Sequence, residues 1–124
     1  MSDKLSRIPI KITVVDKGTA KGFLNRLTAP LTVETIQKRL PINSRTSPAM
    51  GHVSILIGIK RGVEKPVSEV KAGTIAYWSR SDALTIYPNN AKPYSPVNKI
   101  GEIEENLELF LRLRSGTRII IEKN

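Results

Sequence analysis

The sequence predicts a mainly β fold, in which about eight short strands form one closed or nearly closed barrel with two short helices at its ends. Short apolar runs recur at strand spacing, turn-forming residues separate them at close intervals, and only two segments show helical spacing. A chain of 124 residues suits a single domain. We therefore expect residues 1–124 to form one barrel, with residues 1–6 as a flexible N-terminal tail.

The first hairpin is predicted over residues 8–25. Its first strand, residues 8–14, alternates apolar and other residues and places four apolar side chains on one face: Ile8, Ile10, Ile12 and Val14. Pro9 stands near the start of that strand, where a missing backbone donor is tolerated. Residues 16–18, Asp-Lys-Gly, indicate a turn, and the returning strand is expected over residues 19–25.

A short helix is predicted over residues 33–40, because its apolar residues recur on one helical face, as Val33, Ile36 and Leu40. Thr32 is the expected N-cap, since its hydroxyl can accept a hydrogen bond from a free N–H of the first turn. Pro41 ends the helix, because the residue before a proline is pushed out of helical geometry.

Two further strands are expected over residues 42–46 and 52–60, with residues 47–51 as the loop between them. The second of these strands is the most apolar in the chain, and four of its side chains share one face: Val53, Ile55, Ile57 and Ile59. Gly58 indicates a bend or a close approach of the backbone.

The second half begins with a predicted hairpin of residues 74–78 and 83–87. A proline-rich loop over residues 88–96 follows, and then a short strand over residues 97–103.

The second helix is predicted over residues 105–113, where three apolar residues recur at helical spacing: Leu107, Phe110 and Leu111. Ser115 and Gly116 provide its C-terminal stop. The last strand is expected over residues 117–122, and its three consecutive isoleucines favour a position between two other strands.

The composition limits the possible classes of protein. The chain has no cysteine, which excludes disulfides and thiolate metal sites and favours a reducing compartment. Its first residues lack the apolar core of a signal peptide, and no apolar run approaches the roughly 20 residues that cross a bilayer. We therefore expect a cytoplasmic protein without membrane contact. The fifteen isoleucines, together with many charged residues, are typical of thermophile proteins.

The net charge of +9 is concentrated in the first half of the chain. Residues 1–61 carry eleven Lys or Arg against three Asp or Glu, whereas residues 62–124 carry nine against eight. Such asymmetry indicates either an acidic partner, above all nucleic acid, or a role in solubility. The interleaved aromatic residues of a dedicated single-strand binder are missing. The residues expected to form a nucleic-acid-binding surface are Arg26, Lys38, Arg39, Arg45, Lys60 and Arg61.

Two segments carry a resemblance to a known family. Residues 72–78, Ala-Gly-Thr-Ile-Ala-Tyr-Trp, and residues 96–103, Pro-Val-Asn-Lys-Ile-Gly-Glu-Ile, resemble the small cyclophilin-like proteins of archaea and bacteria. The resemblance covers about residues 70–123, and the first half agrees mainly in the order of its elements. It implies a closed, eight-stranded cyclophilin-like barrel with two helices, in a family that is mostly uncharacterised, so that fold alone does not give function.

The resemblance also implies candidate residues for a prolyl isomerase. Cyclophilins carry an Arg-x-x-Pro-x-Phe segment, and this chain has Arg-Thr-Ser-Pro-Ala-Met at residues 45–50. Arg45 would then donate to the rotating amide, and Met50 would form the floor of the cup for the proline ring. The glutamine and the later histidine that accompany this segment have no clear counterparts. The alternative is that Arg45 is a solvated strand residue.

Three further residues are candidates to line a cleft. Tyr77 and Trp78 are adjacent on a strand and so point to opposite faces, one into the core and the other to a cleft or the surface. His52 is the only histidine, and without suitably spaced carboxylates it does not build a metal site. No nucleophile elbow and no phosphate-cradling glycine pattern occurs, so we expect no metal and no cofactor.

The leading hypothesis is a non-catalytic binding module whose cleft holds a small molecule or an extended, proline-containing peptide. Binding of DNA, RNA or a ribonucleoprotein through the basic N-terminal half is the alternative. Peptidyl-prolyl cis-trans isomerisation is third, and it is the activity expected if the chain is an enzyme. The sequence leaves the oligomeric state open.

Overall fold

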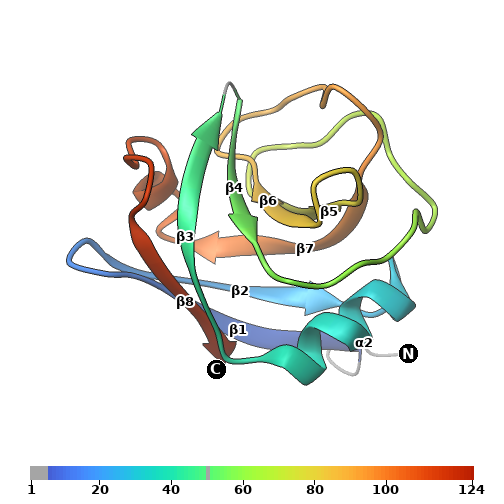
Figure 1. Ribbon diagram of the computed structural model, residues 1–124, viewed down its shortest axis with the longest axis horizontal. Coiled ribbons are helices and arrows are strands. Elements are labelled where there is room, and N and C mark those ends of the chain that lie inside the picture. Colours follow the sequence, from blue (N-terminus) through green and yellow to red (C-terminus); the bar gives the residue numbers. More distant parts are fainter. Residues whose placement is uncertain (1–5, 50) are drawn as a thin grey trace.

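The computed structural model describes residues 6–49 and 51–124 and shows a closed antiparallel barrel (Figure 1). Around the barrel the strands follow the order β1-β2-β7-β5-β6-β4-β3-β8. Their bounds are β1 Arg7–Val14, β2 Gly18–Asn25, β3 Ile42–Ala49, β4 His52–Leu56, β5 Thr74–Trp78, β6 Ala83–Ile86, β7 Asn98–Glu105 and β8 Arg118–Lys123. One α-helix, α2 (Pro30–Arg39), and one 3-10 turn, η1 (Leu107–Phe110), accompany the strands in the described part of the chain. The predicted mainly β barrel of eight strands is therefore confirmed.

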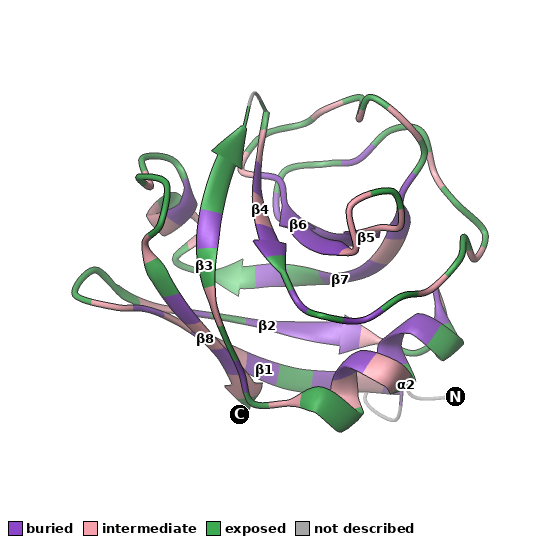
Figure 2. Cartoon of the chain, viewed as in Figure 1, coloured by how far each residue is buried: buried purple, intermediate pink, exposed green. Residues whose placement is uncertain are grey.

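The alternation predicted for the first strand directs its isoleucines into the barrel. Ile8, Ile10, Ile12 and Val14 are buried, while the residues that alternate with them are exposed or half-buried (Figure 2). The last strand, β8, pairs with β1 on one side and β3 on the other, so its predicted position between two strands is confirmed. Ile119 and Ile121 face the core, and Ile120 is half-buried on the outer side. Burial of these β-branched side chains supplies the main driving force for closing the barrel.

Helix α2 lies across one end of the barrel and buries Val33 and Ile36 in the core (Figure 1). It begins three residues earlier than predicted, because a proline is well suited to a first helical position. The prediction that Thr32 is the N-cap is wrong, since Thr32 lies inside the first turn. The free N–H groups of Leu31 and Thr32 donate instead to the carboxylate of Glu64, at 3.1 and 2.7 Å.

The second helix, predicted over residues 105–113, is present only as the shorter 3-10 turn η1. Strand β7 continues to Glu105, which pairs with Lys21 of β2, and only the short turn η1 follows. Asn106 has a left-handed backbone (φ 62°) and donates from its amide to the carbonyl of Thr19, which ends the strand. Residue 105, which was expected to begin the helix, therefore belongs to a strand because it pairs with β2. Phe110 of η1 is buried at the barrel end opposite α2.

The strands around β3 also differ from their predicted lengths. Strand β3 runs through most of the expected loop to Ala49, and Pro48 pairs with Val53 of β4. Its other neighbour, β8, pairs only as far as Arg45, so the missing N–H of Pro48 faces no partner strand. Strand β4 stops at Leu56 rather than at residue 60, because Gly58 adopts a positive φ of 70°.

Of the expected N-terminal tail, only Ser6 lies within the described residues. Ser6 is buried, and its carbonyl accepts a hydrogen bond from the N–H of Arg26 at 2.8 Å. Residues 1–5 lie outside the described part. None of the described helices is long and apolar enough to cross a membrane.

Candidate functional site

The outer side of strands β3, β4, β6 and β5 carries the candidate site. Residues paired directly across neighbouring strands point to the same side of the sheet. Ala49 of β3 pairs with His52 of β4, and Ser54 of β4 pairs with Thr85 of β6. Three outward side chains of β5 and β6 are small, which leaves room for large rings to lie across this face: Ala76, Ala83 and Thr85.

Three aromatic rings meet on this face. The ring of His52 lies 6.1 Å from that of Trp78, edge to face, and 5.5 Å from that of Tyr87. Tyr87 is buried in a second small apolar cluster, and Trp78 packs against it. The indole N–H of Trp78 donates to the hydroxyl of Ser95 at 2.7 Å, so the polar atom of the indole is satisfied.

Two loops cover part of the same face and hold these rings. Isolated bridges join Val67 to Val97 and Val70 to Ala91, outside the main strands. They bring the segment before β5 against the proline-rich segment after β6, over the outer side of the barrel. The predicted proline-rich loop therefore forms part of the cover and places Ser95 beside the indole.

The electrostatics of the face favour neutral rings. Burial lowers the pKa of His52 below its ordinary value of 6.5, so the imidazole is neutral at pH 7. Burial also raises the pKa of Tyr87, whose hydroxyl lies 3.3 Å from that of Thr85. In the part of the chain that the structure describes, no three side chains able to bind a metal come together.

A pocket of about 150 Å³ opens beside His52, at the barrel end that η1 closes. Its wall comes from the β3–β4 hairpin, from the residues just after β6 and from η1 with the segment after it. Residues that line it include Pro48, His52, Pro88, Phe110, Leu111 and Leu113. Leu111 is 55% exposed, so it forms an accessible apolar edge of the pocket.

A larger hollow of about 530 Å³ lies between residues 69–71 and residues 90–92. Its lining is mainly polar and charged, with Val70 and Ala91 as the apolar residues. The smaller pocket beside His52 is lined mostly by apolar residues and lies next to three aromatic rings, and we regard it as the better candidate site.

The cleft-lining candidates lie in different places. His52 lines the pocket, and Trp78 lies beside His52. Tyr77 points into the barrel and is fully buried, so adjacent Tyr77 and Trp78 do face opposite sides. Met50 lies outside the described residues.

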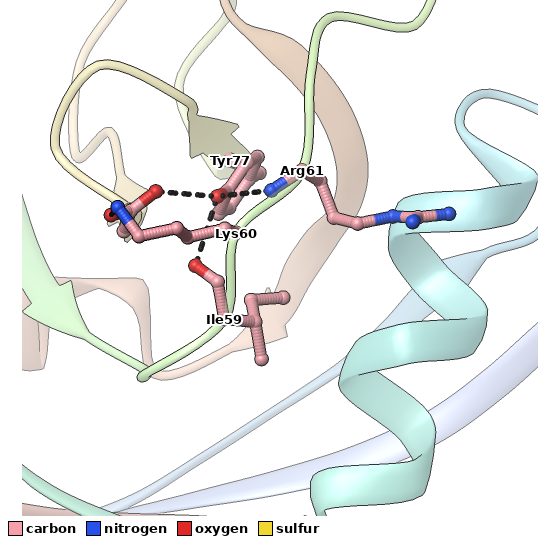
Figure 3. Close-up of polar contacts among 5 residues, drawn as sticks. Ile59, Lys60, Arg61 and Tyr77 are labelled. Atoms are coloured by element: carbon pink, nitrogen blue, oxygen red, sulfur yellow. Dashed lines mark hydrogen bonds and ion pairs between the residues drawn. The ribbon is translucent and has the colours of Figure 1, made fainter.

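Tyr77 anchors the segment that follows β4, at the end of the barrel that α2 covers. Its hydroxyl accepts the N–H of Arg61 at 3.0 Å and lies 3.1 Å from the carbonyl of Ile59 and from a carboxylate oxygen of Asp82 (Figure 3). Burial, together with the hydrogen bond to Asp82, raises the pKa of Tyr77, so the hydroxyl stays protonated and can donate. Asp82 also pairs with Lys60 at 3.2 Å.

A second polar cluster joins the same segment to α2. The buried amide of Asn98 accepts the N–H of Glu64 at 2.7 Å and donates to the carbonyl of Gly62 at 3.0 Å. Glu64 in turn accepts from the hydroxyl of Thr32 at 2.7 Å. Desolvation acts to raise the pKa of Glu64, but the hydrogen bonds from Thr32 and Leu31 outweigh it and hold that pKa below 4.5.

The basic residues expected to bind nucleic acid divide into groups. The guanidinium of Arg39 lies beside Gly58, and Arg61 lines a small pocket with Leu31 and Glu64, so both lie along α2. Two other members of the set are engaged in ion pairs, Lys38 with Glu34 and Lys60 with Asp82. Arg26 follows β2, near the start of α2.

Arg45 lies apart from that group, on the outer side of β3. It pairs in register with Arg118 of β8, and its guanidinium donates to the carbonyl of Gly116 at 2.9 Å. Sequence reasoning missed the arginines that accompany it, because the net charge of the second half is small. The signal was present in residues 111–114, Leu-Arg-Leu-Arg, which were interpreted as part of a helix.

Comparison with known proteins gives one family match. A family model described as cyclophilin-like matches residues 8–122. None of the curated proteins matches the chain.

Two solved structures share the fold. The solution structure of the hypothetical protein AF2241 from Archaeoglobus fulgidus superposes with a TM-score of 0.78 and 21% identity, over 96% of both chains. The structure of McbB in complex with tryptophan superposes with a TM-score of 0.77 and 18% identity, over 93% of this chain and 44% of McbB. At these identities the likeness concerns the fold alone.

Proposed function

Because this chain belongs to the cyclophilin-like family, we propose that it is a non-catalytic binding module whose pocket beside His52 receives one ring or apolar side chain of an extended, proline-containing peptide. The observation that carries the proposal is the pocket at the end of the β3–β4 hairpin, next to the rings of His52, Trp78 and Tyr87.

The size of the pocket favours part of a peptide over a whole small molecule. Its volume of about 150 Å³ equals about five water molecules at roughly 30 Å³ each, which suits a prolyl ring. Pockets for drug-sized molecules measure about 300–1,000 Å³. McbB, 44% of which this chain covers, has been solved in complex with tryptophan, and this supports a small ligand with a flat ring as the other candidate for this chain.

The position of Arg45 supports binding without catalysis. An isomerase needs a donor beside the prolyl amide, and Arg45 is the residue that the resemblance assigns to this role. It does not line the pocket, and its guanidinium donates to the carbonyl of Gly116 at 2.9 Å. We therefore expect the protein not to accelerate the cis-trans isomerisation of the prolyl amide.

Trp78 provides the assay, because it is the only tryptophan and its ring touches that of His52. Titration with blocked Ala-Pro-Ala peptides is expected to change its fluorescence saturably. Leu111→Ala removes an apolar edge of the pocket and should weaken binding about fivefold, or roughly 1 kcal/mol. Leu27→Ala is the matched control, because Leu27 is 58% exposed and lies away from the pocket.

Two results would contradict the proposal. One is the absence of any saturable signal with proline peptides at millimolar concentration. The other is acceleration of prolyl cis-trans exchange that disappears in Arg45→Ala, which would make the protein an isomerase.

Nucleic-acid binding through the surface along α2 is the second candidate, supported by the positions of Arg39 and Arg61 beside that helix. Binding of mixed-sequence single-stranded RNA or duplex DNA that weakens as salt rises would support it. That affinity should weaken again in Lys38→Glu/Arg39→Glu. No binding even at low salt would leave the basic charge as a solubility feature.

A further inference from the structure

We propose that the peptide bound beside His52 is acidic, because four arginines form a cationic rim next to the pocket. The arginine rim consists of Arg45, Arg112, Arg114 and Arg118. This inference rests on the proposed function and adds to it the chemical class of the partner.

Residues 111–114 connect the rim to the pocket. Their sequence is Leu-Arg-Leu-Arg, and the pocket is lined by Leu111 and Leu113. Arg112 and Arg114, the residues between and after the leucines, are exposed. The same short segment therefore supplies apolar walls to the pocket and two cations to its surroundings.

The other two arginines face each other across β3 and β8. Arg45 and Arg118 are directly paired in register, and both are exposed on the outer side of the barrel. Like charges at such a position repel and destabilise the sheet. A carboxylate placed between them would relieve that repulsion. An acidic ligand is therefore expected to bind more tightly here than beside a single arginine.

Hydrogen bonds fix the backbone that carries the rim. The Thr46 N–H donates to the carbonyl of Thr117 at 2.8 Å, and the Gly116 N–H donates to the carbonyl of Thr46 at 2.7 Å. The hydroxyls of Thr46 and Thr117 both donate to the carbonyl of Arg114, at 3.0 and 2.8 Å. The segment before β8 thus lies along β3, as Figure 1 shows, and the arginines project from an ordered backbone. A charge on an ordered backbone loses less entropy on binding than one on a mobile loop.

The rim is also available to a ligand. Within residues 6–49 and 51–124, the ion pairs involve other basic residues, among them Lys11, Lys38, Lys60 and Lys99, and none involves the arginine rim. The segment from residue 109 to residue 121 contains no Asp or Glu. Of these four guanidinium groups, only that of Arg45 has a hydrogen-bond partner among the described residues, the carbonyl of Gly116, and it keeps further donors for a carboxylate.

An acidic peptide fits this surface better than a nucleic acid. The rim borders a pocket of single-side-chain size, which a peptide can fill while its neighbouring residues reach the arginines. Arg45 lies three residues along β3 from Pro48, which lines the pocket, and this is about 10 Å. Binding of nucleic-acid strands relies on exposed aromatic side chains for stacking, and the rings near the pocket, Trp78 and Tyr87, are partly or fully buried.

Two blocked peptides test the inference on the full chain, namely Asp-Glu-Ala-Pro-Ala-Glu-Asp and its counterpart with Asn and Gln in place of the acidic residues. Their affinities are measured by Trp78 fluorescence and by calorimetry, at low salt and at about 0.15 M. The acidic peptide is expected to bind about tenfold more tightly at low salt, since several exposed charge pairs act together. The difference should shrink at the higher salt.

The variant Arg112→Glu/Arg114→Glu should remove the preference for the acidic peptide and leave the affinity for the neutral one unchanged. Both side chains are exposed, so the fold is expected to survive, and Arg112→Gln/Arg114→Gln repeats the test without new charges. Lys71→Glu/Lys92→Glu is the matched control, because it changes the net charge equally at exposed positions on other loops. It should reduce the preference by less than twofold.

The outcomes separate the two proposals. Equal affinities for the two peptides would overturn the acidic partner and leave the binding module intact. Failure of both peptides to bind would overturn both. If Lys71→Glu/Lys92→Glu reduced the preference for the acidic peptide as much as the arginine variant does, the net positive charge of the protein, and not the arginine rim, would attract that peptide. This result would overturn the inference. RNA binding that the arginine variants abolish, with no preference between the peptides, would assign the rim to phosphates and overturn the inference.

Discussion

Replacement of Tyr77 by phenylalanine tests how firmly the segment after β4 is held to the barrel. The change removes one oxygen from a fully buried side chain and keeps the packing of the ring. The N–H of Arg61 loses its acceptor at 3.0 Å, and one donation is lost, to either Ile59 or Asp82 at 3.1 Å. At about 1 kcal/mol for each hydrogen bond, the free energy of unfolding should fall by about 2 kcal/mol.

The expected shift in Tm follows from the size of the domain. An unfolding entropy of roughly 2.1 cal/mol/K per residue gives about 0.26 kcal/mol/K for this chain, so a loss of 2 kcal/mol lowers Tm by about 8 °C. Urea and thermal unfolding followed by Trp78 fluorescence measure both quantities. Tyr94→Phe is the matched control, because Tyr94 is 88% exposed, and it should leave Tm within about 1 °C. If Tyr77→Phe unfolds with the midpoint of the wild type, the hydroxyl does not hold the segment and this reasoning is refuted.

Three further predictions concern stability. Asn98→Ala leaves two backbone groups near α2 without their partners and should cost about 3 kcal/mol in urea unfolding, and a loss below 1 kcal/mol would contradict the proposed anchoring. The folded-state pKa of His52 is lowered, so stability is full above about pH 6.5 and falls as the pH decreases toward that lowered pKa; Tm measured against pH should show this fall, and His52→Gln should flatten the part of it just below pH 6.5. In Gly101→Ala, the added Cβ would collide with the backbone carbonyl of Phe23 on the adjacent strand, so circular dichroism should show loss of the barrel, whereas Gly62→Ala, with open space around it, should fold normally.

Local pattern was sufficient to predict the first hairpin and the barrel. The alternation of isoleucines in residues 8–14 predicts β1 because side chains on a strand alternate between the core and the outside. A short turn separates the two segments predicted as strands over residues 74–78 and 83–87, and the structure confirms this hairpin as β5 and β6. The resemblance carried by residues 72–78 and 96–103 predicted the cyclophilin-like family, which the family match confirms.

The second helix and the cap of α2 could not be predicted in the same way. Leu107, Phe110 and Leu111 recur at helical spacing, which predicted a helix. In the structure Glu105 pairs with Lys21 of β2, so β7 extends to residue 105 and only the short turn η1 follows it. Glu64 caps α2 from more than thirty residues away, whereas Thr32 had the favoured residue type at a position inside the helix. Both differences come from contacts between segments distant in sequence, which no local pattern contains.

For the candidate site, too, the sequence identified single residues, and the fold determined how they are arranged. His52 and Trp78 were identified as residue types suited to a cleft, and Arg45 through the resemblance. Only the closed barrel brings the ring of His52 to that of Trp78, places the pocket beside them and sets Arg45 opposite Arg118.

Local sequence patterns were enough to establish which side of each strand is apolar, and therefore that the chain buries an isoleucine-rich core in a β barrel. That information is local, since alternation depends only on the geometry of one strand. Tertiary structure decided which charges lie together. Net charge counted along the chain placed the basic surface in the first half, but pairing of β3 with β8 joins Arg45 to arginines about seventy residues later. Electrostatic interaction depends on distance in space, and the fold sets that distance.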